Sequence, residues 1–387
     1  MTEAAAPPTP ERTRSIDLLR GIVMVLMVLD HARDFFVGIG AGPTDLATTT
    51  LPLFFTRWVT HVCAPVFVLL AGVSAALYAA KRGLPAARHF LLTRGLWLVL
   101  LELTIVRFAW IPEPFYRFSL LQVIWVLGWA MVVLAGLSYL PRRAIVAVGA
   151  LIVLGHNALD PLDRGNFGAL ELLWNLLHER GVLTLGGRKV FVSYPVLPWL
   201  GVTALGFGLG GWYQQPAADR QRWILRTGAL LTLGFVLLRG LNVYGDPTPW
   251  TPQARGGWFT LLSFLNCQKY PPSLAYLLMT LGPALMALSL LERVPAKSWQ
   301  PLVTFGRVPL FFYVLHLYLL RFSAAPLAFA RFGPSAFKPP PGHAGSPEYP
   351  LWTAYVALTI ALLLLYPACR WFARKKAEAR SPWLSYL

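Results

Sequence analysis

Ten stretches of predominantly apolar residues, spread along almost the whole chain, constrain its fold more than any other feature. A helix of about 20 apolar residues crosses the hydrocarbon core of a bilayer, which is about 30 Å thick. The sequence therefore predicts an all-α, polytopic integral membrane helix bundle with about ten transmembrane helices, forming a single domain over residues 1–387. The stretches are Ile16–Phe36, Leu53–Ala80, Phe90–Trp110, Phe115–Leu140, Ala144–Ala158, Tyr194–Tyr213, Trp223–Leu241, Pro271–Leu291, Leu302–Phe322 and Leu351–Phe372.

The composition supports a membrane protein. Hydrophobic residues make up 56% of the chain and charged residues 13%, whereas soluble domains carry about 25% charged residues. Such a chain could not cover its surface with polar groups, so the lipid bilayer is its expected surroundings. The net charge of +17 would suggest nucleic acid for a soluble protein. In a membrane protein, Lys and Arg in cytoplasmic loops explain it, and no nucleic-acid partner is expected.

The distribution of Lys and Arg predicts the orientation. With the N-terminus inside, the inner segments carry many positive charges, including Lys81, Arg82, Arg142 and Lys375, and the short outer links carry few. Cytoplasmic loops hold this excess, and an even number of spans places both termini in the cytoplasm. The outer loops at residues 159–193, 242–270 and 323–350 are long enough to form a cap with short helices, such as Leu170–Arg180.

Ionisable side chains at membrane depth are costly, which makes them candidates for function. The first span ends in Asp30-His31-Ala32-Arg33-Asp34, where helical spacing links carboxylates, an imidazole and a guanidinium. A carboxylate beside an imidazole fixes its tautomer and raises its basicity, so His31 with Asp34 is the favoured general base. Asp30 belongs to the same set as a candidate substrate-binding residue. A salt-bridge cluster that caps the span is the alternative.

The second span begins with Arg57 and His61, which lie four residues apart on one helical face. Pro65, four residues after His61, is expected to loosen the helix and free a backbone carbonyl. His61 with Arg57 is a candidate to support the reacting carbonyl or the acceptor. A packed, hydrogen-bonded histidine is the structural alternative.

Two further segments are expected to reach the same depth. His316 lies about 20 Å along the ninth stretch, which starts inside, and Lys269-Tyr270 directly precedes the eighth, which starts outside. His31, His61 and His316 are therefore expected to converge toward the outer face. A scaffold of structural ion pairs would explain the charges but not their shared depth.

Other familiar chemistry finds no support in the sequence. There is no His-x-x-x-His pair, Walker loop, Gly-x-Ser-x-Gly elbow or Gly-x-Gly-x-x-Gly after a strand. His156 and His178 lie in outer loops without a partner at a useful spacing. No metal site and no permanently bound cofactor are therefore expected.

The opening Arg14-Ser15-Ile16-Asp17-Leu18-Leu19-Arg20-Gly21, followed by an apolar span, resembles the start of the heparan-α-glucosaminide N-acetyltransferase catalytic-domain family. The resemblance is greatest to the bacterial branch of this family, and the opening motif is also similar to that of other transmembrane acyltransferases that modify cell-surface sugars. Further similar segments are His61–Gly72, Phe264–Gly282, Phe305–Tyr318 and Tyr366–Lys376.

The resemblance implies a membrane acyltransferase of the bacterial inner (plasma) membrane. It would move an acyl group, acetyl being the expected one, from cytoplasmic acyl-CoA (acetyl-CoA) to an acceptor such as a sugar or cell-envelope glycan at the outer side. The sequence leaves a homodimer open. The expected CoA-binding residues are Arg14, Arg20 and Arg307, the expected catalytic residues are His31, Asp34, His61 and His316, and the expected substrate-binding residues are Asp30, Arg57, Lys269 and Tyr270.

One departure from the family bears on the mechanism. The lysosomal member carries an important histidine in the outer loop between its first two spans, whereas the stretch Ala32–Thr60 has none. Direct, general-base-assisted transfer is therefore expected in place of a covalent acyl-histidine. A transporter or flippase of a glycan or lipid, with the same His and Asp side chains as a proton relay, is the alternative function.

Overall fold

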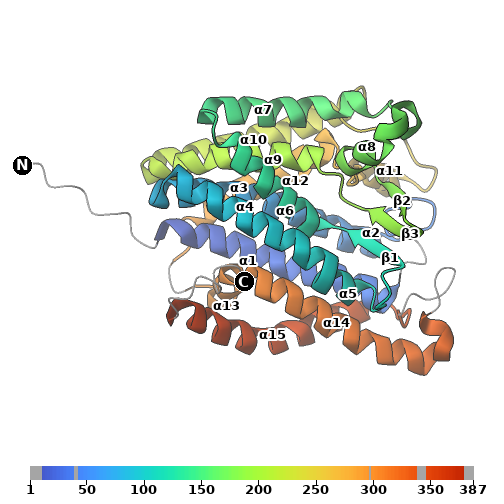
Figure 1. Ribbon diagram of the computed structural model, residues 1–387. Helices are drawn as coiled ribbons and strands as arrows, with labels where there is room; N and C mark the ends of the chain where they lie inside the picture. The colour runs from blue at the N-terminus through green and yellow to red at the C-terminus, as the bar shows by residue number, and fades with distance from the viewer. Residues whose placement is uncertain (1–10, 39–41, 296–297, 338–345, 379–387) are drawn as a thin grey trace, which may run out of the picture.

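The computed structural model describes residues 11–38, 42–295, 298–337 and 346–378. Long helices run side by side in a bundle, and a small sheet with short helices caps one end of it (Figure 1). Seven helical segments are long and apolar enough to cross a membrane, which confirms a polytopic helical membrane protein. These segments are Leu51–Arg82, Leu84–Trp110, Arg142–Leu159, Ala217–Leu241, Leu274–Leu291, Pro309–Phe337 and Trp352–Glu378.

Most predicted stretches correspond to one helix or to two helices in line. The long helices are α1 (Glu11–Ala32), α3 (Cys63–Arg82), α4 (Leu84–Leu101), α6 (Val123–Leu137), α7 (Arg142–Gly155), α9 (Leu197–Gly210), α10 (Ala217–Leu241), α12 (Leu274–Leu291), α14 (Pro309–Phe332) and α15 (Trp352–Glu378). The shorter ones are α2 (Leu51–Val59), α5 (Arg107–Trp110), α8 (Glu171–Leu177), α11 (Gly257–Leu265) and α13 (Gln300–Arg307).

The ninth predicted stretch is two helices and not one. Val308 has φ −127° and ψ 51°, which ends α13, and α14 begins at Pro309. Proline lacks the N–H that an uninterrupted helix needs and restricts the residue before it. His316 therefore lies only about 10 Å from the start of its helix, which corrects the expected 20 Å. The helix α14 also continues to Phe332, into the predicted outer loop at 323–350.

The fourth predicted stretch is also wrong at its beginning. Residues Phe118–Leu121 form strand β1, and the helix α6 starts only at Val123. Pro112 and Pro114 follow the end of α5, where they prevent the helix from continuing, and residues Phe118–Leu121 pair with β3 instead of forming a helix. The sheet order is β1-β3-β2, with β3 (Arg188–Val192) parallel to β1 and antiparallel to β2 (Gly181–Leu185).

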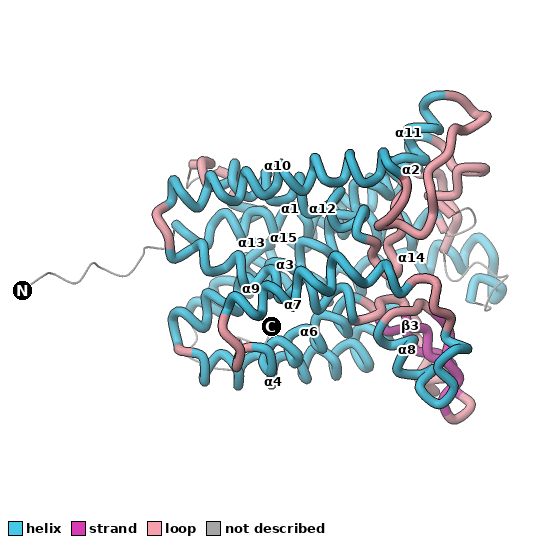
Figure 2. The backbone as a smooth tube through the Cα atoms, turned by 90° about the horizontal axis from the view of Figure 1, so that it is seen from above, coloured by secondary structure: helices cyan, strands magenta, loops and turns pink. Residues whose placement is uncertain are grey.

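The cap gathers elements from distant parts of the chain. The helices α8 and α11 and the strand β3 lie at the same end of the bundle (Figure 2). The predicted short helix within Leu170–Arg180 is confirmed by α8. The β2–β3 hairpin was not predicted, although its turn residues Gly186 and Gly187, both with positive φ, are typical of tight hairpins.

Glycines let pairs of bundle helices approach closely. A Cβ atom on Gly72 of α3 would overlap the backbone of Thr203 on α9, and one on Gly206 would overlap that of Leu69. Where α13 packs against α1, a Cβ atom on Gly306 would likewise overlap the backbone of Asp17. Small residues at such crossings are typical of helix packing in membranes.

Candidate functional site

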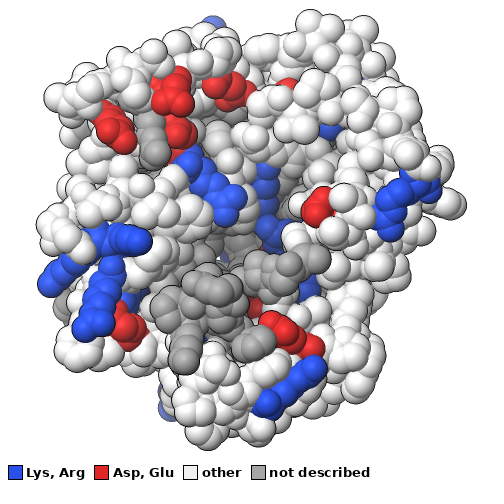
Figure 3. All heavy atoms as spheres, turned by 90° about the vertical axis from the view of Figure 1, so that its right-hand side faces the viewer, with Lys and Arg blue, Asp and Glu red and all other residues white. Residues whose placement is uncertain are grey.

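Two cavities enter the bundle from opposite ends. We name the cavity beneath the cap the outer cavity and the one at the opposite end the inner cavity. The outer cavity, about 1010 Å³, is lined by Asp30, His31, Arg57, His61, Lys269 and Tyr270 among others. Seen from the cap end, the surface is hollowed near its centre, and Lys and Arg side chains lie along part of the edge of the hollow (Figure 3). The inner cavity, about 330 Å³, is mostly apolar with a basic rim.

A pair of imidazoles lies at the inner side of the outer cavity. His31 Nδ1 is 2.7 Å from His316 Nε2, and the two rings lie almost parallel, 5.0 Å apart. His316 is fully buried, and its Nδ1 lies 3.0 Å from the carbonyl oxygen of Phe312. The structure thus brings together two of the three predicted histidines, from α1 and α14.

The hydrogen bonds of this pair define the tautomers of the neutral rings. A carbonyl oxygen only accepts, so Nδ1 of His316 donates to Phe312 and Nε2 of His316 is left as an acceptor. Nδ1 of His31 then donates to His316. This leaves Nε2 of His31 with a free lone pair, on the member of the pair that lines the outer cavity. Of the two rings, His31 is therefore the one with a nitrogen that could accept a proton, and His316 is its hydrogen-bond partner.

The carboxylates near His31 are engaged by guanidinium groups. Both oxygens of Asp30 accept from Arg57, at 2.6 and 2.5 Å, and Asp30 also accepts from Arg33 at 3.0 Å. Asp34 lies 2.5 Å from Arg33. The structure therefore gives His31 a different hydrogen-bond partner, His316, from the predicted Asp34. Asp34 lines the cavity beside the pair.

The aromatic and cationic residues of the cap complete the outer cavity. Tyr270 accepts from Arg57 at 3.5 Å and lies 3.4 Å from the hydroxyl of Tyr194. Lys269 and Arg180 lie over its ring, at 5.2 and 5.0 Å from the centroid. Burial by itself would raise the pKa of Tyr270, but the charges of Lys269 and Arg57 outweigh it and lower the pKa to about 8. Arg180 was not predicted, because it follows α8 far from the other site residues in the sequence.

His61 lies in the break of the second span. The turn Thr60–Val62 is a 3₁₀ helix between α2 and α3, and the backbone carbonyl of His61 accepts from Tyr276 at 2.7 Å. This confirms that Pro65 frees a carbonyl of the preceding turn. The His61 ring is buried at the wall of the outer cavity, and its Nδ1 has no hydrogen-bond partner among the described residues.

Basic residues from four helices surround the inner cavity. They are Arg20, Arg94, Arg307 and Lys376. Arg20 donates to Asp17, to the carbonyl of Gly306 and to the hydroxyl of Ser74, at 3.1–3.2 Å. The side chain of Arg307 is 61% exposed, which leaves it accessible to a ligand. Arg94 and Lys376 were not predicted as site residues, because nothing in the sequence shows that their helices meet.

Arg14 lies apart from this group. It donates to the backbone carbonyls of Pro295 and Ser298, at 3.1 and 2.6 Å, and is not among the residues that line the inner cavity. Its contacts hold the start of α1 against the segment before α13. Of the three predicted CoA-binding arginines, the structure therefore places Arg20 and Arg307 together and Arg14 elsewhere.

The two cavities share a boundary at two residues. Tyr313 of α14 and Val123, the first residue of α6, line both of them. The ring of Tyr313 lies 5.5 Å from that of His316 and 6.3 Å from that of His31. Tyr313 thus lies between the inner cavity and the imidazole pair, of which His31 lines the outer cavity.

Other buried charged residues stabilise the fold through hydrogen bonds to the backbone. Glu102 accepts from the backbone N–H of Trp125 at 3.1 Å and so caps the first turn of α6. Arg107 donates to the carbonyl of Phe118 and supports β1. Arg239 donates to carbonyls of Phe264 and Ser263 at the end of α11.

Fold and site together define a polytopic helical membrane protein with two cavities that share the lining residue Tyr313, next to a histidine pair. The family model for heparan-α-glucosaminide N-acetyltransferase, catalytic, matches residues 12–242, and the chain belongs to this family of membrane acetyltransferases. None of the curated proteins matches the chain. The match includes Arg20, His31 and His61, whereas Arg307 and His316 lie beyond it.

Proposed function

We propose that this protein transfers an acetyl group from acetyl-CoA, bound in the inner cavity, to a hydroxyl or amine of a sugar in the outer cavity. The family supports acetyl transfer. The single observation that supports the rest is that Tyr313 lines both cavities and lies beside His31 and His316. A sugar or cell-envelope glycan is the proposed acceptor class.

The proposed orientation has the cap outside. The first turn of α1 and the last turn of α15 lie at the end of the bundle opposite the sheet (Figure 1). Inner-end residues such as Arg82, Arg142 and Lys375 supply the positive charge that cytoplasmic faces carry. With α1, α6 and α9 added to the seven long apolar segments, ten helices cross the bilayer and both termini are cytoplasmic.

The donor side fits an acyl-CoA by charge and shape. Arg20, Arg94, Arg307 and Lys376 can neutralise CoA phosphates at the rim, because guanidinium forks pair well with phosphate oxygens. The apolar walls, formed by residues such as Met24, Met27 and Leu98, suit the pantetheine arm. The thioester would then lie near Tyr313.

The proposed chemistry uses the free Nε2 of His31. It takes the proton from the acceptor as the acceptor oxygen or nitrogen forms a bond to the thioester carbonyl carbon. The C–S bond breaks, the CoA thiolate leaves, and the proton passes from His31 to the thiolate. The His31–His316 hydrogen bond would stabilise the imidazolium while it exists. No covalent enzyme intermediate is required.

Turnover of radiolabelled acetyl-CoA by purified protein in lipid nanodiscs, with glucosamine as the acceptor, tests the proposal. His31→Ala should lower turnover by about 10²–10⁴-fold, the usual cost of losing a positioned general base. His89→Ala, at an exposed histidine of α4 outside both cavities, is the matched control and should retain turnover.

Two results would count against the proposal. Equal turnover per folded molecule in His31→Ala and wild type would remove His31 from the chemistry. Uptake of glucosamine without acetylation, in liposomes that hold acetyl-CoA, would instead favour a transporter that uses the same imidazoles as a proton relay.

A further inference from the structure

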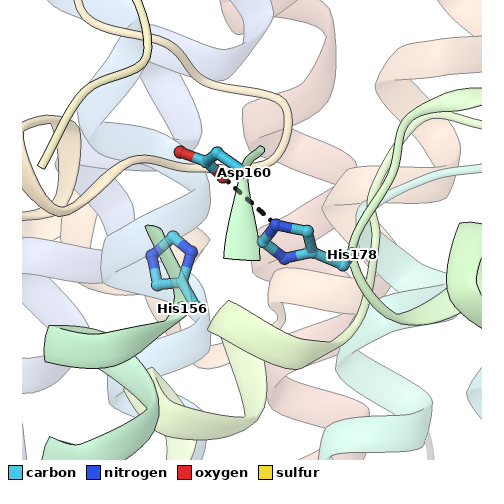
Figure 4. A group of neighbouring side chains, drawn as sticks. All are labelled: His156, Asp160 and His178. Carbon is cyan, nitrogen blue, oxygen red and sulfur yellow. Dashed lines mark hydrogen bonds and ion pairs between the residues drawn. The ribbon is translucent and has the colours of Figure 1, made fainter. Parts of the chain in front are cut away.

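A second cluster of chemically active side chains lies outside both cavities, where the bundle meets the cap. His156 follows α7, Asp160 lies in the next turn, and His178 follows α8. Asp160 Oδ1 lies 3.1 Å from Nε2 of His178, and the rings of the two histidines are 6.0 Å apart. Figure 4 shows the three side chains close together, with His156 and Asp160 from the turn after α7 and His178 from the end of α8.

The pairing of His178 with Asp160 leaves His156 unexplained. His156 is 2% exposed, and neither of its ring nitrogens has a hydrogen-bond partner among the residues that the structure describes. A buried imidazole without a partner loses the hydrogen bonds that it made to water, which costs free energy. Buried polar groups of this kind require an occupant such as an ion or a water molecule.

We propose that His156, Asp160 and His178 bind a divalent transition-metal ion, Zn²⁺ being the best fit. One potential ligand atom from each residue lies within 4.8 Å of the others. Ligand atoms on a tetrahedral zinc, each about 2.0–2.2 Å from the metal, lie about 3.4 Å from one another. The 3.1 Å between Asp160 and His178 is already close to this value, and the ligand atom of His156, within 4.8 Å of the other two, would move closer to the metal on binding.

The donor set selects the class of metal. Two imidazoles and one carboxylate are typical zinc ligands, whereas Mg²⁺ and Ca²⁺ prefer sites made of oxygen atoms. The second oxygen of Asp160 accepts from the side-chain amide of Asn157 at 2.8 Å. Asn157 in turn accepts from the backbone N–H of Leu274 at 2.8 Å. This chain orients the carboxylate and ties the site to the start of α12, as outer-shell partners of metal ligands do.

The position of the cluster indicates a structural role for the metal. It would join the end of α7 to the end of α8, two residues before Arg180, which lines the outer cavity. Removing the ion should therefore loosen α8 and the β2–β3 hairpin, and leave the inner half of the bundle intact.

Metal analysis of tag-free protein, grown with zinc and purified without chelator, tests the inference. Wild type and His89→Ala should contain stoichiometric zinc by mass spectrometry, whereas His156→Ala and His178→Ala should contain little. Zinc added to chelator-treated wild type should raise its Tm by several degrees, because a ligand that binds only the folded state stabilises it. It should not raise the Tm of the two variants.

Wild-type protein alone keeps the inference testable if the variants do not fold. Co²⁺ added to the chelator-treated protein should give the intense visible absorption of a tetrahedral site, which zinc should abolish. Metal-free wild type whose Tm and spectrum do not respond to either ion would overturn the inference and leave water as the occupant. Zinc retained equally by folded His156→Ala would overturn it as well.

Discussion

At the scale of single residues, the hydrogen bond between His31 and His316 determines which nitrogen is free to react. His316 is held by the carbonyl of Phe312, one helical turn earlier in α14. Its remaining nitrogen then fixes the His31 ring. In this account His316 touches no substrate and acts by positioning His31.

Substitutions at His316 distinguish positioning from direct catalysis. His316→Ala should lower turnover by about 10–100-fold, the range expected for losing one hydrogen bond to a charged group. His316→Gln should recover part of the loss, because its side-chain oxygen can accept from Nδ1 of His31. The measurement is turnover normalised to monodisperse protein. Equal, complete loss in both variants would indicate that His316 itself carries the proton.

Tyr270 provides a prediction about pH. Its pKa is about 8 in the folded protein, below the value of about 10 for an unfolded chain. The folded state therefore favours the phenolate, and this contribution to stability is complete above pH 10 and is lost as the pH falls through about 8.

Ultraviolet difference spectra measure this ionisation directly. Wild type minus Tyr270→Phe should show phenolate absorption that appears around pH 8. The matched change Tyr139→Phe, at an exposed tyrosine between α6 and α7, should leave that step in place. A difference spectrum that appears only near pH 10 would contradict the electrostatic role given to Lys269 and Arg57.

The sequence predicts the members of the candidate site better than their pairings. His31, Arg57 and Lys269 stand out as ionisable groups at apolar positions, and the structure places all three around one cavity. The hydrogen-bond partner of His31 could not be predicted from the sequence. Both nearby carboxylates bind guanidinium groups instead, Asp30 that of Arg57 from a different helix and Asp34 that of Arg33. Helical spacing shows which side chains share a face but not which neighbours compete for them.

At the scale of elements, the long apolar runs reveal the spans but not their irregular ends. Hydropathy is averaged over many side chains, so it cannot reveal the backbone break at Val308 or the strand β1. Pro309 explains the first difference, and pairing with β3 explains the second. The His156–Asp160–His178 cluster was not predicted for a different reason. Asp160 and His178 are 18 residues apart in the sequence, and only the fold of the cap brings them together.

Close helix crossings lead to a prediction about stability. Gly72→Ala should destabilise the protein by about 1–3 kcal/mol, since the new methyl group would overlap the backbone of α9. Gly136→Ala is the matched control on α6, where nothing lies within 4 Å of an added Cβ. It should be neutral or stabilise by about 0.5–1 kcal/mol. Thermal unfolding in one detergent compares them, and equal Tm values would contradict the packing described for α3 and α9.

In the whole molecule, the helix bundle holds two cavities of different chemical character close to each other. The inner cavity carries the basic rim suited to CoA, and the outer cavity lies beneath the cap. Tyr313 and Val123 are the only described residues that line both. This arrangement would let a donor and an acceptor react without either crossing the bilayer.

Transfer across a sealed membrane is the most direct test of this arrangement. Proteoliposomes with the cap facing outward would hold radiolabelled acetyl-CoA inside, with glucosamine added outside. We expect labelled N-acetylglucosamine outside, formed by wild type and by His89→Ala, and reduced about 10²–10⁴-fold in His31→Ala. Label that forms only when acetyl-CoA and glucosamine are on the same side, or equally in His31→Ala, would contradict transfer at the histidine pair.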